Sequence, residues 1–249
     1  MAYHAKAAWY YDFFADKTDL PFFRRLMLRF GGPVLDLATG TGRVALDLAG
    51  AGLEVVGVDN SRHMLEVAQA KLDRQGPSIK ERLELVEGDM ADLPLRRSFK
   101  SAIIAGGSFA HLLSSRDQQG CLKSVVGLLE AGGKLVLDLI PPDRELLNGG
   151  TQVGRSVNVD GDVSLLRTIH WRSDLNLQRA WSTIIYEKYR GNVLQERVLE
   201  EFIISLLFPR EVQLLLEQAG FSVEEILGDT TGGSFSSSSR RLIIMGVKK

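Results

Sequence analysis

The stretch PVLDLATGTGRVALDLAGAGLEVVGVDN, residues 33–60, decides the fold. Apolar residues at 34–37 predict a short buried strand, and Gly40-Thr41-Gly42 predicts a tight turn where a side chain would block a ligand. Apolar residues at helical spacing follow over 44–49, and residues 54–58 return to a strand that ends in Asp59. This strand–helix–strand unit, with an acidic residue at the tip of its second strand, is suited to an adenosine-containing ligand.

The alternation of strand and helix continues to residue 140. Short apolar strands are expected at 83–86, 101–105 and 134–140, with helices at 62–74 and 118–130. Strands that are apolar on both faces and alternate with helices predict a doubly wound, mostly parallel sheet. Ahead of this unit, residues 1–30 are expected to form helices that lie over the site.

Residues 151–207 follow a different pattern, with long alternating segments at 163–173, 177–190 and 193–207 separated by turn signals. They predict an antiparallel sheet of three or four strands, inserted after the fifth strand. Because ligands of a parallel α/β sheet bind beyond the carboxyl ends of its strands, this inserted sheet can roof the site. A helix at 209–219 and two strands at 221–227 and 242–247 then close the chain.

The expected fold is therefore α/β, a seven-stranded doubly wound sheet that is mostly parallel and ends in an antiparallel terminal hairpin. Two closing strands with no helix between them imply the hairpin. We expect residues 1–150 and 208–249 to form the core, and 151–207 to form the inserted antiparallel roof. A chain of 249 residues fits one domain with an elaboration better than two independent domains.

Composition excludes several classes of protein. A net charge of −1 gives no electrostatic case for a nucleic-acid partner, and the arginine pairs at 24–25, 96–97 and 240–241 are interpreted as solvated surface. The single cysteine, Cys121, lies in a helical apolar pattern that indicates a buried structural thiol, and the four histidines show no metal-ligand spacing. No apolar run approaches the ~18 residues of a membrane span, so we expect a cytoplasmic protein without a membrane partner.

Three features bear on which adenosine ligand the glycine turn holds. The pattern over 40–45 also satisfies a loose dinucleotide motif, so the glycines alone do not choose between NAD and S-adenosylmethionine. Asp36 precedes the turn, where a carboxylate can engage a cationic amino-acid group but would face a pyrophosphate badly. Asp89 follows the third strand, where it can accept from an adenine amino group. The closing hairpin is also not how a six-stranded, fully parallel dinucleotide domain ends.

Five blocks of sequence carry a resemblance to a known family. They are VLDLATGTGRVALDLA, VVGVDNSRHMLEVA, VEGDMADLPL, AGGSFAHLL and LLEAGGKLVLDL, in the family's order. The chain resembles a class I S-adenosylmethionine-dependent methyltransferase. It is most similar to the branch that methylates small molecules, such as glycine, amino-sugar and antibiotic N-methyltransferases. The resemblance covers roughly residues 10–140 and says little about the methyl acceptor.

The resemblance implies a set of cofactor contacts at the strand ends. Asp36 and the backbone of 38–42 would contact the methionine end, and Asp59 would accept both ribose hydroxyls. The family has a glycine where this chain has Ala38, a small exchange that should still permit a close approach of the backbone. The residues expected to bind S-adenosylmethionine are Tyr11, Asp36, Ala38, Thr39, Gly40, Gly42, Arg43, Asp59, Asn60, Met64, Gly88, Asp89, Met90, Ala105 and Gly106.

Methyl transfer from a sulfonium is an in-line displacement, so orientation can supply ~7–11 kcal/mol of the barrier, and a base serves only to free the nucleophile of a proton. The catalytic candidates are His111, after the fourth strand, and Tyr11, in an N-terminal Tyr-Asp pair that in the family folds over the methionine end. Packing roles for both stay open. The candidates for substrate contact are His170, Arg172 and Tyr186 on the roof.

The expected function is methyl transfer from S-adenosylmethionine, released as S-adenosylhomocysteine, to an amine or hydroxyl of a small molecule, without a metal. The chain could be a monomer or a homodimer. Three alternatives stay open: a methyltransferase acting on a protein or tRNA, a non-catalytic S-adenosylmethionine-binding protein, and a nicotinamide-dependent dehydrogenase. Methylation of a nucleic-acid base is disfavoured, because the fourth strand ends in Ala-Gly-Gly-Ser instead of an Asn/Asp-Pro-Pro-aromatic clamp.

Overall fold

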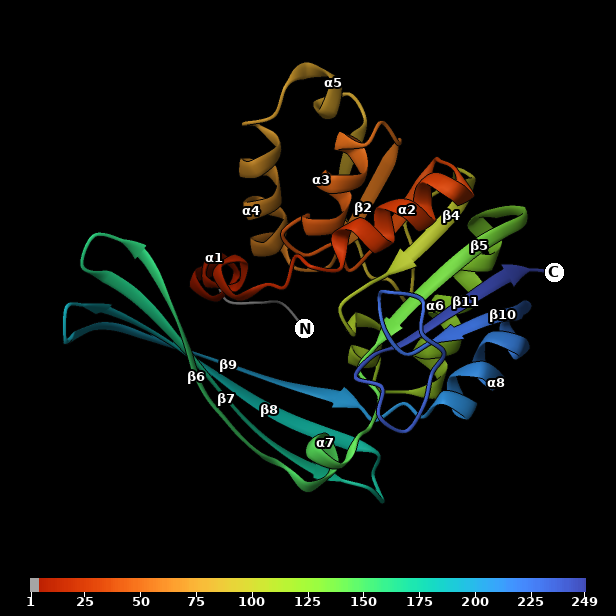
Figure 1. Ribbon diagram of the computed structural model, residues 1–249. Helices are drawn as coiled ribbons and strands as arrows, with labels where there is room; N and C mark the ends of the chain where they lie inside the picture. The colour runs from red at the N-terminus through yellow and green to blue at the C-terminus, as the bar shows by residue number, and fades with distance from the viewer. Residues whose placement is uncertain (1–4) are drawn as a thin grey trace.

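The computed structural model describes residues 5–249 and is built around a seven-stranded sheet with the order β10-β11-β5-β4-β1-β2-β3 (Figure 1). The strands are β1 (Val34–Leu37), β2 (Val55–Asp59), β3 (Leu83–Glu87), β4 (Phe99–Ile104), β5 (Leu129–Leu139), β10 (Phe221–Leu227) and β11 (Leu242–Lys248). β1 to β5 run parallel, whereas β11 pairs antiparallel with β5 and β10. The expected parallel sheet with an antiparallel terminal hairpin is confirmed.

Helices cover both faces of this sheet because successive strand residues point to opposite sides. Val34, Ile103 and Val136 pack on the side of α2 (Leu20–Phe30), α3 (Arg43–Gly50) and α4 (Arg62–Leu72). The alternate residues, such as Leu35 and Leu137, pack on the side of α6 (Ser115–Leu128) and α8 (Pro209–Ala219). A hydrophobic core on each face of the sheet therefore fixes the positions of the carboxyl ends of the parallel strands.

Smaller differences from the expected elements lie at their boundaries. β5 begins at Leu129, earlier than expected, and α6 correspondingly ends at Leu128. Three short helices were not expected, namely α5 (Pro77–Lys80), the 3-10 turn η1 (Ser108–His111) and α7 (Arg144–Asn148). The expected helices at 1–30 are observed as α1 (Ala5–Phe14) and α2, and residues 1–4 lie outside the described part of the chain. No helix within 5–249 is long and apolar enough to cross a membrane.

The inserted segment forms a second, four-stranded antiparallel sheet after a short helix, α7 (Arg144–Asn148). Its strands, in spatial order, are β6 (Gly150–Asp160), β7 (Val163–Asp174), β8 (Arg179–Arg190) and β9 (Val193–Ser205). In Figure 1 this sheet is a long curved arm that passes beneath α1. Tyr10 and Phe14 of α1 pack on Tyr186 of β8, with ring centroids 5.7 and 5.9 Å apart. α1 thus lies between the core and the inserted sheet.

Candidate functional site

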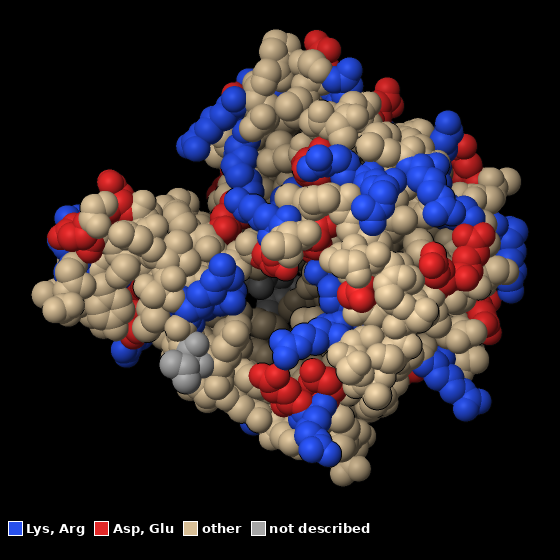
Figure 2. All heavy atoms as spheres, viewed as in Figure 1, with Lys and Arg blue, Asp and Glu red and all other residues tan. Residues whose placement is uncertain are grey.

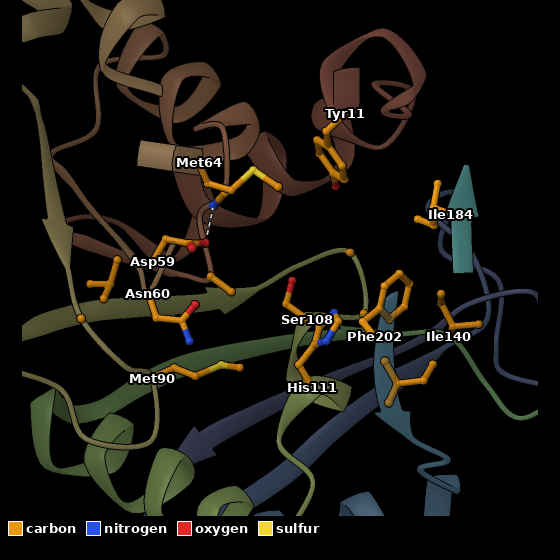
Figure 3. A pocket seen from close by; sticks show the side chains of 17 residues that line it. Tyr11, Asp59, Asn60, Met64, Met90, Ser108, His111, Ile140, Ile184 and Phe202 are labelled. Carbon is orange, nitrogen blue, oxygen red and sulfur yellow. Dashed lines mark hydrogen bonds between the residues drawn. The ribbon is translucent and has the colours of Figure 1, made fainter. Parts of the chain in front are cut away.

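A cavity of about 270 Å³ lies at the carboxyl ends of the parallel strands, beneath the inserted sheet (Figure 3). It extends from the ends of β2 and β3, past β1 and β4, to α1 and β9. The residues that line it are Tyr11, Ala38, Gly40, Val58, Asp59, Asn60, Met64, Gly88, Met90, Gly106, Gly107, Ser108, His111, Ile140, Ile184, Phe202 and Ile204. Ten of the residues predicted from the sequence as site residues are in this lining, and the others lie outside it.

Asp59, the last residue of β2, holds the glycine turn that follows β1. The backbone N–H of Gly40 donates to its Oδ2 and that of Ser61 donates to its Oδ1, both at 2.8 Å. Burial raises the pKa of Asp59, while the hydrogen bonds from Ser61 and Gly40 favour the ionised form. Because each carboxylate oxygen can accept a further hydrogen bond and the side chain lines the cavity, Asp59 can bind two ligand hydroxyls.

Two loops at the cavity, the glycine turn after β1 and the loop after β4, contain glycines in left-handed conformations. Gly40 has φ 58° and Gly106 has φ 68°. A Cβ at Gly106 would meet nothing within 4 Å, and one at Gly40 only the Ala38 carbonyl at 4.0 Å, so a side chain there would take up ligand space. Ala38 has φ 53°, where an L-residue costs roughly 1–2 kcal/mol. This strain is the physical reason why a glycine suits position 38.

Four predicted cofactor residues lie behind the turn, outside the lining of this cavity. Asp36 is 2% exposed, and its carboxylate accepts a 2.6 Å hydrogen bond from the hydroxyl of Thr39. Burial raises the pKa of Asp36 to about 7. Gly42 precedes α3 in a left-handed conformation, and Arg43 is ion-paired with Asp19. Direct contact of these four residues with the cofactor stays a prediction.

One half of the cavity has the shape and chemistry for a flat aromatic base. Met64 and Met90 lie on opposite sides of it in Figure 3, with Asp59 and Asn60 between them. Gly88 and Val58 complete this half. The predicted residues Asp89 and Ala105 are not in the lining, and the carboxylate of Asp89 accepts from the backbone N–H of Ala91 at 2.8 Å.

The other half of the cavity is lined by apolar side chains with a few polar groups. Tyr11 comes from α1, and Ser108 and His111 come from η1 (Figure 3). The ring of His111 packs on Phe202, with centroids 5.4 Å apart, and burial lowers the pKa of His111 to about 4. Burial also raises the pKa of Tyr11. Both side chains are therefore neutral near pH 7.

Strand register decides which residues of the inserted sheet reach the cavity. Ile184 and Phe202 line it, and β8 pairs Ile184 with Ile169 of β7. The predicted substrate residues His170 and Arg172 have the opposite parity on β7, so they face away from the cavity, and the guanidinium of Arg172 stacks on Trp181. Tyr186 has the parity of Ile184 but is 1% exposed beneath α1, outside the lining. All three lie outside the cavity.

α1 is held over the cavity by Asp12, the second residue of the Tyr-Asp pair. Its carboxylate accepts from the hydroxyl of Thr41 at 2.5 Å and from the ammonium of Lys71 at 2.7 Å. Thr41 belongs to the glycine turn and Lys71 to α4, so the helix is tied to two parts of the core. This arrangement places Tyr11 in the wall of the half of the cavity that also holds Ser108 and His111.

A second cavity of about 230 Å³ adjoins the first and shares four lining residues with it, Tyr11, Gly106, Gly107 and Ile140. Its remaining lining residues are Asp16, Asp19, Arg43, Asp138, Leu139 and Arg241. Arg241 was interpreted from the sequence as solvated surface, which is wrong. Its guanidinium binds Asp138 and Asp19, two carboxylates that are only 3% and 2% exposed. Figure 2 shows a hollow between the inserted sheet and the core, with basic and acidic side chains around it.

Several lining residues were missed in the sequence. Asp138 follows the same pattern as Asp59, an acid near the end of a parallel strand, and this signal could have found it. Ile140, the first residue after β5, could have been found in the same way. Phe202 and Ile204 needed the register of the inserted sheet and the bond from the Ser205 hydroxyl to the Leu112 carbonyl, at 3.0 Å, that ties β9 to the core. No local signal indicates that tie.

Comparisons with known proteins agree with this site. A family profile described as a methyltransferase domain matches residues 34–133. The chain is 28% identical over 216 residues to a cypemycin N-terminal methyltransferase of Streptomyces sp, a match that covers 86% of this chain and 82% of that protein.

Solved structures with the same fold extend the comparison over the whole chain. The CcbJ methyltransferase from Streptomyces caelestis superposes with a TM-score of 0.82 at 25% identity, covering 97% of this chain and 96% of that one. A glycopeptide N-methyltransferase, MtfA, solved with S-adenosylhomocysteine, has a TM-score of 0.65 at 24% identity and covers 94% of this chain and 87% of its own.

The fold, the cavity at the strand ends and these relatives define an S-adenosylmethionine-dependent methyltransferase. Among such enzymes the chain resembles those of class I, and its cofactor is S-adenosylmethionine.

Proposed function

We propose that this enzyme transfers the methyl group in line to a small molecule. Of the two acceptor groups that this chemistry allows, an amine and a hydroxyl, we propose the amine. The observation that carries the proposal is the apolar end of the cavity, lined by Ile140, Ile184, Phe202 and Ile204. A small molecule that enters beneath the inserted sheet would meet the methyl donor there.

The cofactor residues are proposed from their places in the cavity. Asp59 accepts the ribose hydroxyls, and Met64 and Met90 lie on either side of the adenine. The backbone of Gly40 and Gly106 lies beside the part of the cofactor that joins the ribose to the methionine. S-adenosylmethionine supplies a methyl group that is already activated by the adjoining sulfonium. The protein's own contribution at the transfer end is to orient the acceptor and exclude water.

An amine suits the polar groups at this end better than an alcohol. Because the pKa of His111 is lowered to about 4, His111 is too weak a base to take the proton of an aliphatic hydroxyl. An amine needs only to be neutral, and transfer from water into an apolar enclosure lowers the pKa of an ammonium group. We propose that neutral His111 accepts a hydrogen bond from the acceptor N–H, and that Tyr11 orients the acceptor from the opposite side.

The relatives support the same choice. The cypemycin enzyme is named as an N-terminal methyltransferase, and MtfA is named as a glycopeptide N-methyltransferase. Both names specify transfer to nitrogen.

The test is a panel of small primary amines and alcohols of matched shape, incubated with the enzyme and S-adenosylmethionine. S-adenosylhomocysteine formation gives the rate, and mass spectrometry locates the new methyl group. We expect turnover of amines with an N-methyl product, and a lower rate in His111→Asn. Turnover of alcohols or phenols alone would contradict the amine assignment, and no turnover of either kind would contradict the small-molecule acceptor.

A further inference from the structure

The second cavity lies on the side of the site that is remote from the adenosine half. The first cavity reaches the ends of β2 and β3 through Asp59 and Gly88, whereas the second is bounded by Asp138 of β5 and Arg241, which directly precedes β11. β5 and β11 are neighbours on the far side of β4. The shared residues Gly106 and Ile140 stand between the two cavities, so a group in the second one lies next to the transfer end.

Its wall is a fixed network of two arginines and two aspartates. Asp138 accepts from Arg241 Nε at 2.9 Å and from the backbone N–H of Gly106 at 2.7 Å. Arg241 Nη2 also donates to Asp19 at 3.1 Å, and Arg43 donates to the same Asp19 carboxylate. The guanidinium of Arg241 lies over the ring of Phe23, 5.6 Å from its centroid. With these contacts, Arg241 is held in one orientation.

The network presents hydrogen-bond donors to the cavity and hides most of its acceptors. Asp19 and Asp138 are 2% and 3% exposed, whereas the side chains of Arg43 and Arg241 are 13% and 24% exposed. Within residues 5–249, no acceptor is bonded to Nη1 of Arg241 or Nε of Arg43. A group that enters the cavity therefore meets N–H donors in fixed positions.

The charge balance of the lining decides what kind of group these donors suit. Arg43 and Arg241 stand against Asp16, Asp19 and Asp138, two cations against three carboxylates. An anionic group of a ligand would accept hydrogen bonds from the arginine N–H groups, but it would be repelled by the net negative charge of the lining. A neutral oxygen gains the same bonds without that repulsion.

We propose that the second cavity is a subsite for a neutral oxygen-bearing group of the acceptor, a hydroxyl or a carbonyl close to the reacting nitrogen, and that Arg241 selects for it. This proposal rests on the small-molecule amine acceptor proposed above. Arg241 acts as a specificity-determining residue, because its free N–H bonds one substituent of the acceptor without touching the transferred methyl.

The test uses three amines on one ring, so that only the neighbouring substituent changes. They are cyclohexylamine, trans-2-aminocyclohexanol and trans-2-aminocyclohexanecarboxylic acid. We expect the amino alcohol to exceed both others in kcat/KM by about tenfold or more, as one hydrogen bond from a charged donor allows. Arg241→Lys keeps the cation beside Asp138 but removes the planar fork, so the ratio of amino alcohol to cyclohexylamine should fall toward one.

Arg24→Lys is the matched control, because Arg24 makes a comparable two-nitrogen pair with Asp47 away from both cavities. It should leave the ratio at the wild-type value. Equal rates for the three amines, an unchanged ratio in Arg241→Lys, or preference for the carboxylate would each overturn the subsite. Equal rates with N-methyl products would leave the proposed function intact. If none of the three reacts, calorimetric binding to the S-adenosylhomocysteine-saturated enzyme replaces turnover, and binding that does not depend on Arg241 overturns the subsite.

Discussion

At the residue scale, Asp59 does two things with one carboxylate. Its oxygens accept the backbone N–H groups of Gly40 and Ser61, so they hold the glycine turn against the start of α4. The same side chain faces the cavity. The glycine turn and the proposed ribose site therefore share one side chain, and a change at position 59 would alter both.

His111 gives a prediction about pH. Its pKa is about 4 in the folded protein against about 6.5 in an unfolded chain, so the unfolded state binds more protons between these values. The free energy of unfolding should therefore be highest above pH 6.5 and fall as the pH drops through 6.5 toward 4. Near pH 5 this loss is on the order of 2 kcal/mol. His111→Asn should lose less stability than wild type between pH 7 and pH 5, measured by urea unfolding.

The control for this prediction is His63→Asn. The His63 side chain is 44% exposed on α4, and its substitution removes a histidine without removing a buried one. If both variants change the pH dependence equally, or neither does, burial of His111 is not the cause.

Residues close to the sequence motifs could be predicted, and those joined across the chain could not. Asp59, Gly40 and Met64 were found because each follows a strand end within one local block. Arg241 could not be found in this way, because its partners Asp138 and Asp19 are 103 and 222 residues away along the chain. An arginine beside another arginine resembles solvated surface until the tertiary fold supplies the carboxylates.

At the scale of elements, the inserted sheet shows what alternation alone leaves undecided. The alternating pattern predicted the strands, but β8 carries large apolar side chains on both faces, such as Ile184 on one and Ile185 on the other. A shift of one residue would exchange the two faces. The phase comes from packing against α1 and from the contacts of β9 with η1, so the sequence alone could not show that His170 and Arg172 face away from the cavity.

These two neighbouring isoleucines provide a matched pair of variants. Ile184 lines the cavity, whereas Ile185 has the opposite parity. Ile184→Ala should lower kcat/KM for the best amine of the panel by about tenfold, since shape complementarity positions the acceptor. It should leave the dissociation constant of S-adenosylmethionine unchanged, because Ile184 is far from the Asp59 end. Ile185→Ala should resemble wild type in both quantities, and similar losses in the two variants would refute the parity assignment.

At the scale of the whole molecule, the cofactor should stabilise the fold, because its site joins α1, the parallel sheet and the inserted sheet. S-adenosylhomocysteine at 100 times its dissociation constant should add about 2.7 kcal/mol, which corresponds to a rise in Tm of roughly 5–10 °C for a chain of this size. NAD at the same concentration should not raise Tm, because the cofactor of this enzyme is S-adenosylmethionine. A rise with NAD alone would contradict the cofactor assignment.

The order of strands also has a consequence for how the protein is made. β11 lies between β5 and β10, and β10 pairs with no other strand. During synthesis β10 leaves the ribosome first and has no sheet to join until β11 follows it. Arg241 directly precedes β11, so the wall of the second cavity also waits for this strand. The half of the site proposed to bind adenosine can form before β11 is made, whereas the subsite proposed to select the acceptor is completed only once β11 has left the ribosome.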